Sequence, residues 1–203
     1  MTRNIRHESI ATRFEHLLKV VANPRFLKME GLGNEVPFFI CDYNPAEAVE
    51  MNRLQRQLAN RLNQQGLRIL EINLYDLSIE LMKAEGDWDW YLAEEAGMTK
   101  ENLLENIQSM LDVEHVLVPA MVNRMAEGPF DVLFISGVGE VFPYIRSHNV
   151  LNNLQKVAKL RPTVLFFPGD YFHSIAAGAS LDLFGRLRDD KYYRAFNIYD
   201  YQV

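Results

Sequence analysis

Residues 36–74 read VPFFICDYNPAEAVEMNRLQRQLANRLNQQGLRILEINL, and this stretch decides the fold. Residues 36–43 are a short apolar run bounded by turn residues, which is typical of a buried strand. Asn44 can cap a helix with Pro45 at its first position, and apolar residues at helical spacing continue until Gly66. Residues 67–74 form a second apolar strand. A strand, a long helix and another strand predict a βαβ unit with parallel strands.

The same alternation continues on both sides of this unit. Further helices are predicted at residues 10–23, 76–82, 99–127 and 147–160, and further strands at residues 131–136, 163–167 and 195–199. We expect Asp76 and Thr99 to cap their helices, Pro119 to interrupt or kink the third of them, and residues 169–185 to be first loop-like and then helical. The predicted fold class is α/β, a three-layer sandwich with a mostly parallel sheet of four or five strands flanked by helices, Rossmann-like but degenerate. We expect residues 1–203 to form a single domain with a small helical insert at 85–98.

Composition and charge exclude several classes of protein. The 203 residues are 48% hydrophobic and 24% charged, as in ordinary globular domains. No run approaches the roughly 20 apolar residues that cross a bilayer, so no membrane association is expected and the cytoplasm is the expected location. A formal net charge of -6 disfavours direct nucleic-acid binding. Cys41, the single cysteine, can form no internal disulfide.

Acidic residues follow the predicted strands, where open parallel sheets bind their ligands. They are Asp42, Asp76, Glu140 and Asp170. If the strands are adjacent, these carboxylates could converge and hold a hard cation or a basic partner. The preferred interpretation is structural, because Asp commonly caps helices at strand-to-helix turns.

No catalytic or cofactor motif is complete. The turn Gly137-Val138-Gly139-Glu140 lacks the third glycine of a dinucleotide fingerprint, since Phe142 stands there, and no phosphate-binding loop ending in Gly-Lys-Ser or Gly-Lys-Thr exists. Cys41 lies in an apolar run, which favours a buried structural thiol over a nucleophile. No cysteine or histidine spacing suits zinc. We therefore expect neither a metal nor a cofactor, and an enzyme is the less favoured interpretation.

The densest polar cluster begins six residues after the glycine turn and enters the helix at 147–160. It consists of Arg146, Ser147, His148, Asn149, Asn152 and Asn153. Arg146 and the helix N-terminus could bind an anion, and His148 titrates near neutral pH. Alternatively, Ser147 and Asn149 cap the helix while the other side chains bond loop carbonyls. Both interpretations stay open, and with Asp42 and Glu140 the cluster supplies the candidates for a ligand-binding edge.

Two segments are candidate partner-binding surfaces. Near the C-terminus, basic and aromatic residues alternate with acids, and the candidates there are Arg186, Arg188, Tyr192, Tyr193 and Arg194. Tyr and Arg are enriched in interface hot spots, although a self-neutralised solvated face is the simpler explanation. The aromatic residues Trp88, Trp90 and Tyr91 in the insert form the second candidate, with core packing of the insert as the slightly favoured alternative.

Several segments, taken in order over about residues 10–200, resemble the BrxB family. They are PFFICDY at 37–43, LEINLYD at 70–76, GVGE at 137–140 with IRSHNVLNNL at 145–154, FFPG at 166–169 and DDKYYRAF at 189–196. The resemblance implies a core protein of BREX systems, which block phage replication and methylate host DNA to mark self. Proteins of this family have no accepted catalytic role and accompany a methyltransferase, an ATPase and the PglZ protein.

These observations favour one function and leave two alternatives. The favoured hypothesis is a non-catalytic assembly adaptor that contacts PglZ, other BREX components or a second copy of itself. The first alternative is a ligand- or nucleotide-binding sensor, or a weak enzyme, that uses the carboxyl edge of the sheet. The second is DNA contact through the C-terminal basic residues, which the net charge makes the least favoured.

Overall fold

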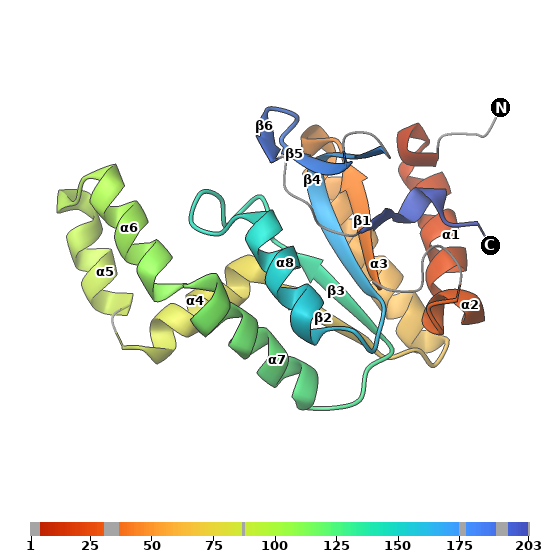
Figure 1. Ribbon diagram of the computed structural model, residues 1–203, viewed down its shortest axis with the longest axis horizontal. Coiled ribbons are helices and arrows are strands. Elements are labelled where there is room, and N and C mark those ends of the chain that lie inside the picture. Colours follow the sequence, from red (N-terminus) through yellow and green to blue (C-terminus); the bar gives the residue numbers. More distant parts are fainter. Residues whose placement is uncertain (1–4, 31–36, 87, 175–177, 190–194, 203) are drawn as a thin grey trace.

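The computed structural model describes residues 5–30, 37–86, 88–174, 178–189 and 195–202. A parallel sheet lies at its centre, with the strand order β2-β3-β4-β1-β7 (Figure 1). These strands are β1 (Phe38–Tyr43), β2 (Ile69–Asn73), β3 (Val132–Ser136), β4 (Thr163–Ser174) and β7 (Phe196–Asn197). β1 and β2 are parallel as predicted, but β4 and β3 lie between them. The α/β class with a mostly parallel sheet is confirmed.

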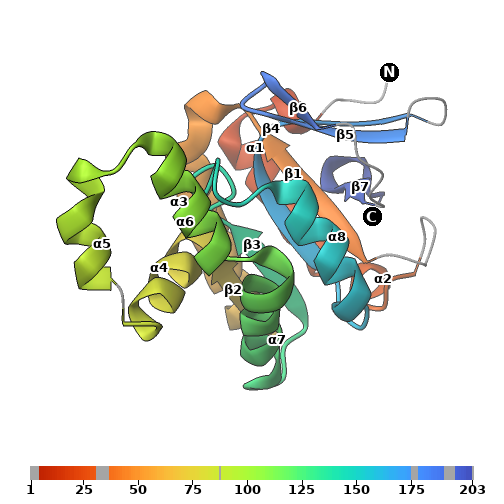
Figure 2. The ribbon, with the colours of Figure 1, turned by 60° about the vertical axis from the view of Figure 1, so that its left-hand side comes forward.

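Helices cover both faces of the sheet. One face carries α1 (Ile10–Val21), α2 (Pro24–Leu27) and α3 (Ala48–Gln64), and the other carries α4 (Leu74–Ala84), α7 (Val118–Ala126) and α8 (Ser147–Val157). The remaining helices are α5 (Trp88–Glu94) and α6 (Lys100–Met110), the 3-10 turns η1 (Ile5–His7), η2 (Pro45–Glu47), η3 (Glu95–Gly97) and η5 (Ile198–Asp200), and the π-helical turn η4 (Val113–Leu117). Figures 1 and 2 show α5 and α6 standing out beyond the sheet on the side of α4.

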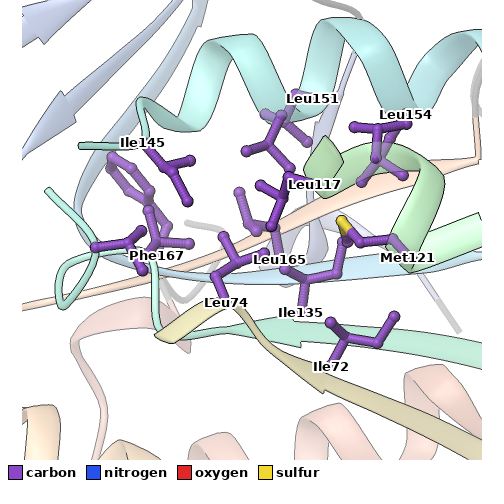
Figure 3. Packing of buried hydrophobic residues seen from close by; sticks show 14 of the residues in the cluster. Ile72, Leu74, Leu117, Met121, Ile135, Ile145, Leu151, Leu154, Leu165 and Phe167 are labelled. Atoms are coloured by element: carbon purple, nitrogen blue, oxygen red, sulfur yellow. The ribbon is translucent and has the colours of Figure 1, made fainter. Parts of the chain in front are cut away.

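Alternation along the strands divides the apolar side chains between two cores. Phe38 and Ile40 of β1 join the core under α4, α7 and α8, whereas Phe39 and Cys41 join the core under α1 and α3. Figure 3 shows the first core, in which Leu151 from α8 lies among side chains from the strands and α7. The nearly continuous apolar sequence of these strands follows from burial on both faces.

The segment after β4 departs from the prediction. Residues 169–185 were expected to be a loop and then a helix, but β4 continues to Ser174 and pairs with antiparallel β5 (Gly178–Leu183), which pairs with β6 (Leu187–Asp189). Leu181 and Leu183 are buried on either side of a less buried Asp182, the two-residue period of a strand. Small residues in this stretch obscured that period.

Three smaller expectations were also wrong, in whole or in part. Asn73 caps α4, because its side chain accepts hydrogen bonds from the amides of Tyr75 and Asp76, so Asp76 lies in the first turn instead. The predicted helix at 99–127 is capped by Thr99 and is interrupted, both as expected, but the interruption is η4 and Pro119 lies after it, in the first turn of α7. The last strand is only Phe196–Asn197, followed by the turn η5.

Candidate functional site

Asp42 lies inside the protein, not on an open sheet edge. It is the fifth residue of β1 and its side chain is 0% exposed. Its Oδ2 accepts a hydrogen bond from the Tyr171 amide at 2.9 Å, its Oδ1 accepts one from Asn197 Nδ2 at 2.9 Å, and Arg6 Nε lies 3.2 Å from Oδ2. Burial raises the pKa of Asp42, while the Tyr171 hydrogen bond and Arg6 act in the opposite direction.

Arg6 joins Asp42 to the next strand. Its guanidinium also forms an ion pair with Asp170 and donates to the carbonyl of Gly169 at 3.1 Å. Both aspartates lie within strands, and Arg6 bridges them from η1. The sequence gives no signal for this contact, since Arg6 is 36 residues from Asp42 along the chain and belongs to no motif. Asp42 is therefore engaged in a structural contact inside the fold.

The four carboxylates do not converge. Asp42 and Asp170 share Arg6, Asp76 lines a polar cleft beside β2, and Glu140 lines an apolar cavity beside α4. Within the described ranges, no group of three or more His, Cys, Asp or Glu side chains is arranged to hold a metal ion. A shared cation site is therefore not observed among these residues, because Arg6 engages Asp42 and Asp170 while Asp76 and Glu140 line two different cavities.

The glycine turn after β3 serves helix packing. Gly137 has φ +77°, and a Cβ atom there would lie 2.3 Å from Asn73 Oδ1 and 3.0 Å from the Leu74 nitrogen. The turn must therefore pass close to the capped N-terminus of α4, where no side chain fits. This contact explains the glycine without a bound phosphate.

The polar cluster at 146–153 splits between the interior and a surface cavity. Ser147 and His148 are buried, Asn152 is half-buried, and Arg146 is the N-cap residue of α8 without a capping side-chain bond. Capping by Ser147 and Asn149, one of the two interpretations left open, is thus wrong. A cavity of about 400 Å³ is lined by Arg146, Asn149 and Asn153 together with acidic residues of η4 and its cap.

Cys41 is a buried thiol, as predicted. Its Sγ lies 3.4 Å from the hydroxyl oxygen of Tyr199, and burial raises the pKa of Cys41 to about 12. At neutral pH such a thiol is protonated and enclosed, so it lacks both requirements of a nucleophile.

The aromatic residues of the insert divide into packed and exposed members. Trp88 and Tyr91 pack against the core under α4, and Lys83 Nζ lies 5.3 Å from the Trp88 ring centroid. Trp90 is 52% exposed, and Leu92 is 57% exposed. Together with half-exposed Tyr75, Leu92 lines an apolar cavity of about 210 Å³ between α4, α5 and α6.

The second candidate surface is only partly described. Arg186 is exposed in the turn after β5, and Arg188 lies on β6 opposite Asp182. The other candidates of this surface, Tyr192, Tyr193 and Arg194, lie outside the described residues. In the described part of the chain, no helix is both long and apolar enough to span a bilayer.

Comparison with known proteins identifies the family. The profile described as BREX protein BrxB matches residues 70–198, which is more than half of the chain. The chain belongs to the BrxB family. A BREX protein BrxB from Bacillus cereus (strain H3081.97) is 34% identical over 199 residues, covering 94% of this chain and 98% of the relative. Another, from Escherichia coli O9:H4 (strain HS), is 25% identical over 188 residues, covering 92% and 90%.

Membership of the BrxB family makes this chain a component of a BREX system. The resemblance seen in the sequence motifs is thereby confirmed, and both relatives match over nearly their whole length. No solved structure matches the chain significantly.

Proposed function

We propose that the chain is a non-catalytic assembly adaptor of a BREX complex and that it binds a PglZ-type protein through the surface of its helical insert. The observation that carries the proposal is a set of exposed apolar side chains: Tyr75 and Leu92 line the cavity between α4, α5 and α6, and exposed Trp90 contacts the ring of Tyr91, which also lines it. Exposed aromatic and aliphatic side chains beside an apolar cavity are typical of protein-binding sites. The packed neighbours Trp88 and Tyr91 hold this surface in place.

The insert suits such a role because it adds little to the core. α5, the helix of the insert, contains no buried residue, and Ile107 is the one buried residue of the adjoining α6. The exposed apolar side chains of the insert therefore contribute little to the packing of the core. A partner that covers them would gain the free energy of removing that apolar surface from water.

Co-expression with the PglZ protein of the same BREX system, followed by size-exclusion chromatography, tests the proposal. The unmodified chain is expected to co-elute with PglZ, and Trp90→Ala and Leu92→Ala are each expected to weaken the complex by about tenfold or more. Leu160→Ala is the matched control, because Leu160 is exposed outside this surface. Each variant is first checked for a native urea midpoint.

Three results would contradict the proposal. Failure of the unmodified chain to co-elute would remove PglZ as the partner. Undiminished co-elution of both insert variants, with loss in Arg186→Glu, would move the interface to the C-terminal surface. Elution of the chain alone as a dimer, dissolved by Trp90→Ala, would assign the insert to self-association.

A second candidate function is a ligand sensor. Its binding site would be the cavity at Arg146 and not the sheet edge at Asp42. Asp42 is taken up by Arg6, Tyr171 and Asn197, whereas exposed Arg146 lines the polar cavity of about 400 Å³. This volume is in the usual range for small-molecule sites. A ligand-dependent rise in melting temperature with a nucleotide or a divalent cation, lost in Arg146→Ala, would support the sensor.

A further inference from the structure

The outer side of β2 is an edge of the sheet that is partly closed at its start, where the Ile69 N–H donates to Asn63 Oδ1 at 3.1 Å. β2 is the terminal strand, and β3 is its one strand partner among the described residues. The Arg68 carbonyl accepts a hydrogen bond from the Val132 amide at 3.4 Å, so Arg68 turns its main-chain groups toward β3. These groups alternate in direction along a strand. The N–H and C=O of Leu70 therefore also point toward β3, and those of Glu71 point outward. Glu71 thus presents both an N–H and a C=O to an additional strand.

A cleft gives access to this edge. It has a volume of about 570 Å³ and is lined by β2, by α3 on one face and by α4 and α7 on the other. Gln55 of α3 and Leu77 of α4 are among its walls. Leu70 and Ile72 provide an apolar surface on the α4 side, whereas Glu71 lies beside Gln55 on the α3 side. The side chains of an added strand would therefore contact a polar wall on the α3 side and a partly apolar wall on the α4 side.

The cleft carries an excess of negative charge. Its acidic residues are Glu71, Asp76, Glu80 and Glu127, and its basic residues are Arg56 and Arg124. Arg124 already pairs with Glu80 and lies 3.9 Å from Glu127. Glu71 is partly desolvated there, which raises its pKa. A lysine or arginine would supply the missing positive charge and could lay its aliphatic stem on the apolar wall.

The same charge argues against pairing with a second copy. Glu71 is the middle residue of the strand Ile69–Asn73, so antiparallel pairing of two β2 strands about their centre would bring the two Glu71 side chains together. Like charges directly opposite one another destabilise a strand pair. The edge therefore favours a chain of opposite charge over another copy of itself.

We propose that the outer edge of β2 binds an extended basic segment of a partner protein as an added strand. The main chain of the segment pairs with the outward groups of Glu71, and its basic side chains contact the acidic groups of the cleft. This mode of recognition takes its binding energy from main-chain hydrogen bonds and its selectivity from alternate side chains. The surface is separate from the insert, so the two proposals can fail independently.

Synthetic peptides and amide NMR of the isotope-labelled full chain test this proposal. The probe is a short capped peptide of alternating Lys and Val, compared with an alternating Glu and Val peptide and with the Lys and Val peptide N-methylated at alternate amides. Saturable shifts centred on Glu71 are expected with the first probe. The other two are expected to bind about tenfold more weakly or worse, because attractive charge or main-chain donors are lost.

Variants of the chain separate the strand from its charge. Glu71→Pro removes the outward N–H without removing a bond to β3, and Glu71→Lys reverses the charge while keeping the main chain. Both variants are expected to bind the Lys and Val peptide about tenfold more weakly than the unmodified chain does. Glu15→Lys is the matched charge reversal, on the exposed face of α1, and is expected to change nothing.

Three outcomes would overturn the proposal. One is the absence of saturable binding by the Lys and Val peptide. Another is equal binding by the N-methylated peptide, or binding that neither Glu71→Pro nor Glu71→Lys weakens. The third is a dimer of the chain that either Glu71 variant dissolves, which would make a second copy the occupant of the edge.

Discussion

The carboxylate of Asp42 joins four segments of the chain. It belongs to β1, and it contacts η1 through Arg6, β4 through Tyr171 and β7 through Asn197. A buried carboxylate is costly unless it is paired and hydrogen-bonded, and here it has both kinds of partner. At the residue scale, this group fixes how the two ends of the chain meet the sheet.

Replacing Asp42 tests that role. Asp42→Ala is expected to lower the free energy of unfolding by about 3–5 kcal/mol, because Arg6 and two hydrogen-bond donors lose their acceptor. Asp170→Ala removes the more exposed partner of Arg6 and is expected to cost about 1 kcal/mol or less. Urea denaturation of both variants measures the difference. Equal losses would show that Asp42 does not hold these segments together.

The thiol of Cys41 is expected to be inert in the folded protein. With a pKa of about 12, its thiolate fraction at pH 8 is about a thousandfold below that of an exposed cysteine. A thiol reagent should therefore label the chain in denaturant but not in buffer, as mass spectrometry can measure. Rapid labelling of the native protein would mean that the core around Tyr199 opens readily.

At the element scale, the start of β2 and the start of β3 are held together by an ion pair. Arg68 donates to both carboxylate oxygens of Asp131 through Nε and Nη2, at 2.9 and 2.7 Å, and its amide donates to the same carboxylate at 2.8 Å. These bonds set the register of the edge strand, since the cross-strand partner of Ile69 is Val132, the residue after Asp131. The side-chain bond from Arg68 lowers the pKa of Asp131 to about 2.

This pKa predicts the acid dependence of stability. Because the folded-state pKa lies below the ordinary value of about 4, the pair stabilises the fold above pH 4 and loses its effect as the pH falls toward 2. Asp131→Asn should therefore be less stable than the unmodified chain near pH 6, and the gap should close by about pH 2. Denaturation series over that pH range measure it. A gap independent of pH would exclude the ion pair as its cause.

The contact between the glycine turn and α4 gives a second prediction at this scale. Gly137→Ala is expected to lower the free energy of unfolding by about 1–3 kcal/mol, because the residue has positive φ and its Cβ would meet the Asn73 cap. Gly128→Ala is the control, since nothing lies within 4 Å of a Cβ there. It should stay within about 0.5 kcal/mol. Similar urea midpoints for both variants would refute the close approach.

At the scale of the whole molecule, stability is distributed unevenly. All five residues of β3 are buried between the two helical layers, whereas α5 has no buried residue. Elements with little buried surface open locally at low cost. We therefore expect α5 to open locally while the sheet stays intact.

Hydrogen exchange of the full chain should reveal this difference. Amides of α5 and α6 are expected to exchange through local opening, insensitive to low urea, whereas those of β3 should exchange only through global unfolding. α3 is the helical control, because six of its residues are buried, and it should be protected like the sheet. Exchange of α5 as slow as that of α3 would contradict the expected local opening.

The local periodicities determined which residues form the main helices and strands, and the motifs indicated the family. Strand order was beyond them, because β1 and β2 are consecutive in the chain yet separated by β4 and β3. The hairpin of β4 and β5 was missed for a different reason, since small residues between the strands obscured their two-residue period. The sequence made Trp90 a candidate contact residue but slightly favoured its packing in the core, and it gave no signal for the sheet edge at Glu71 or the role of Arg6. Tertiary structure decided these features, because an edge, a buried ion pair and a cleft exist only once distant segments are packed together.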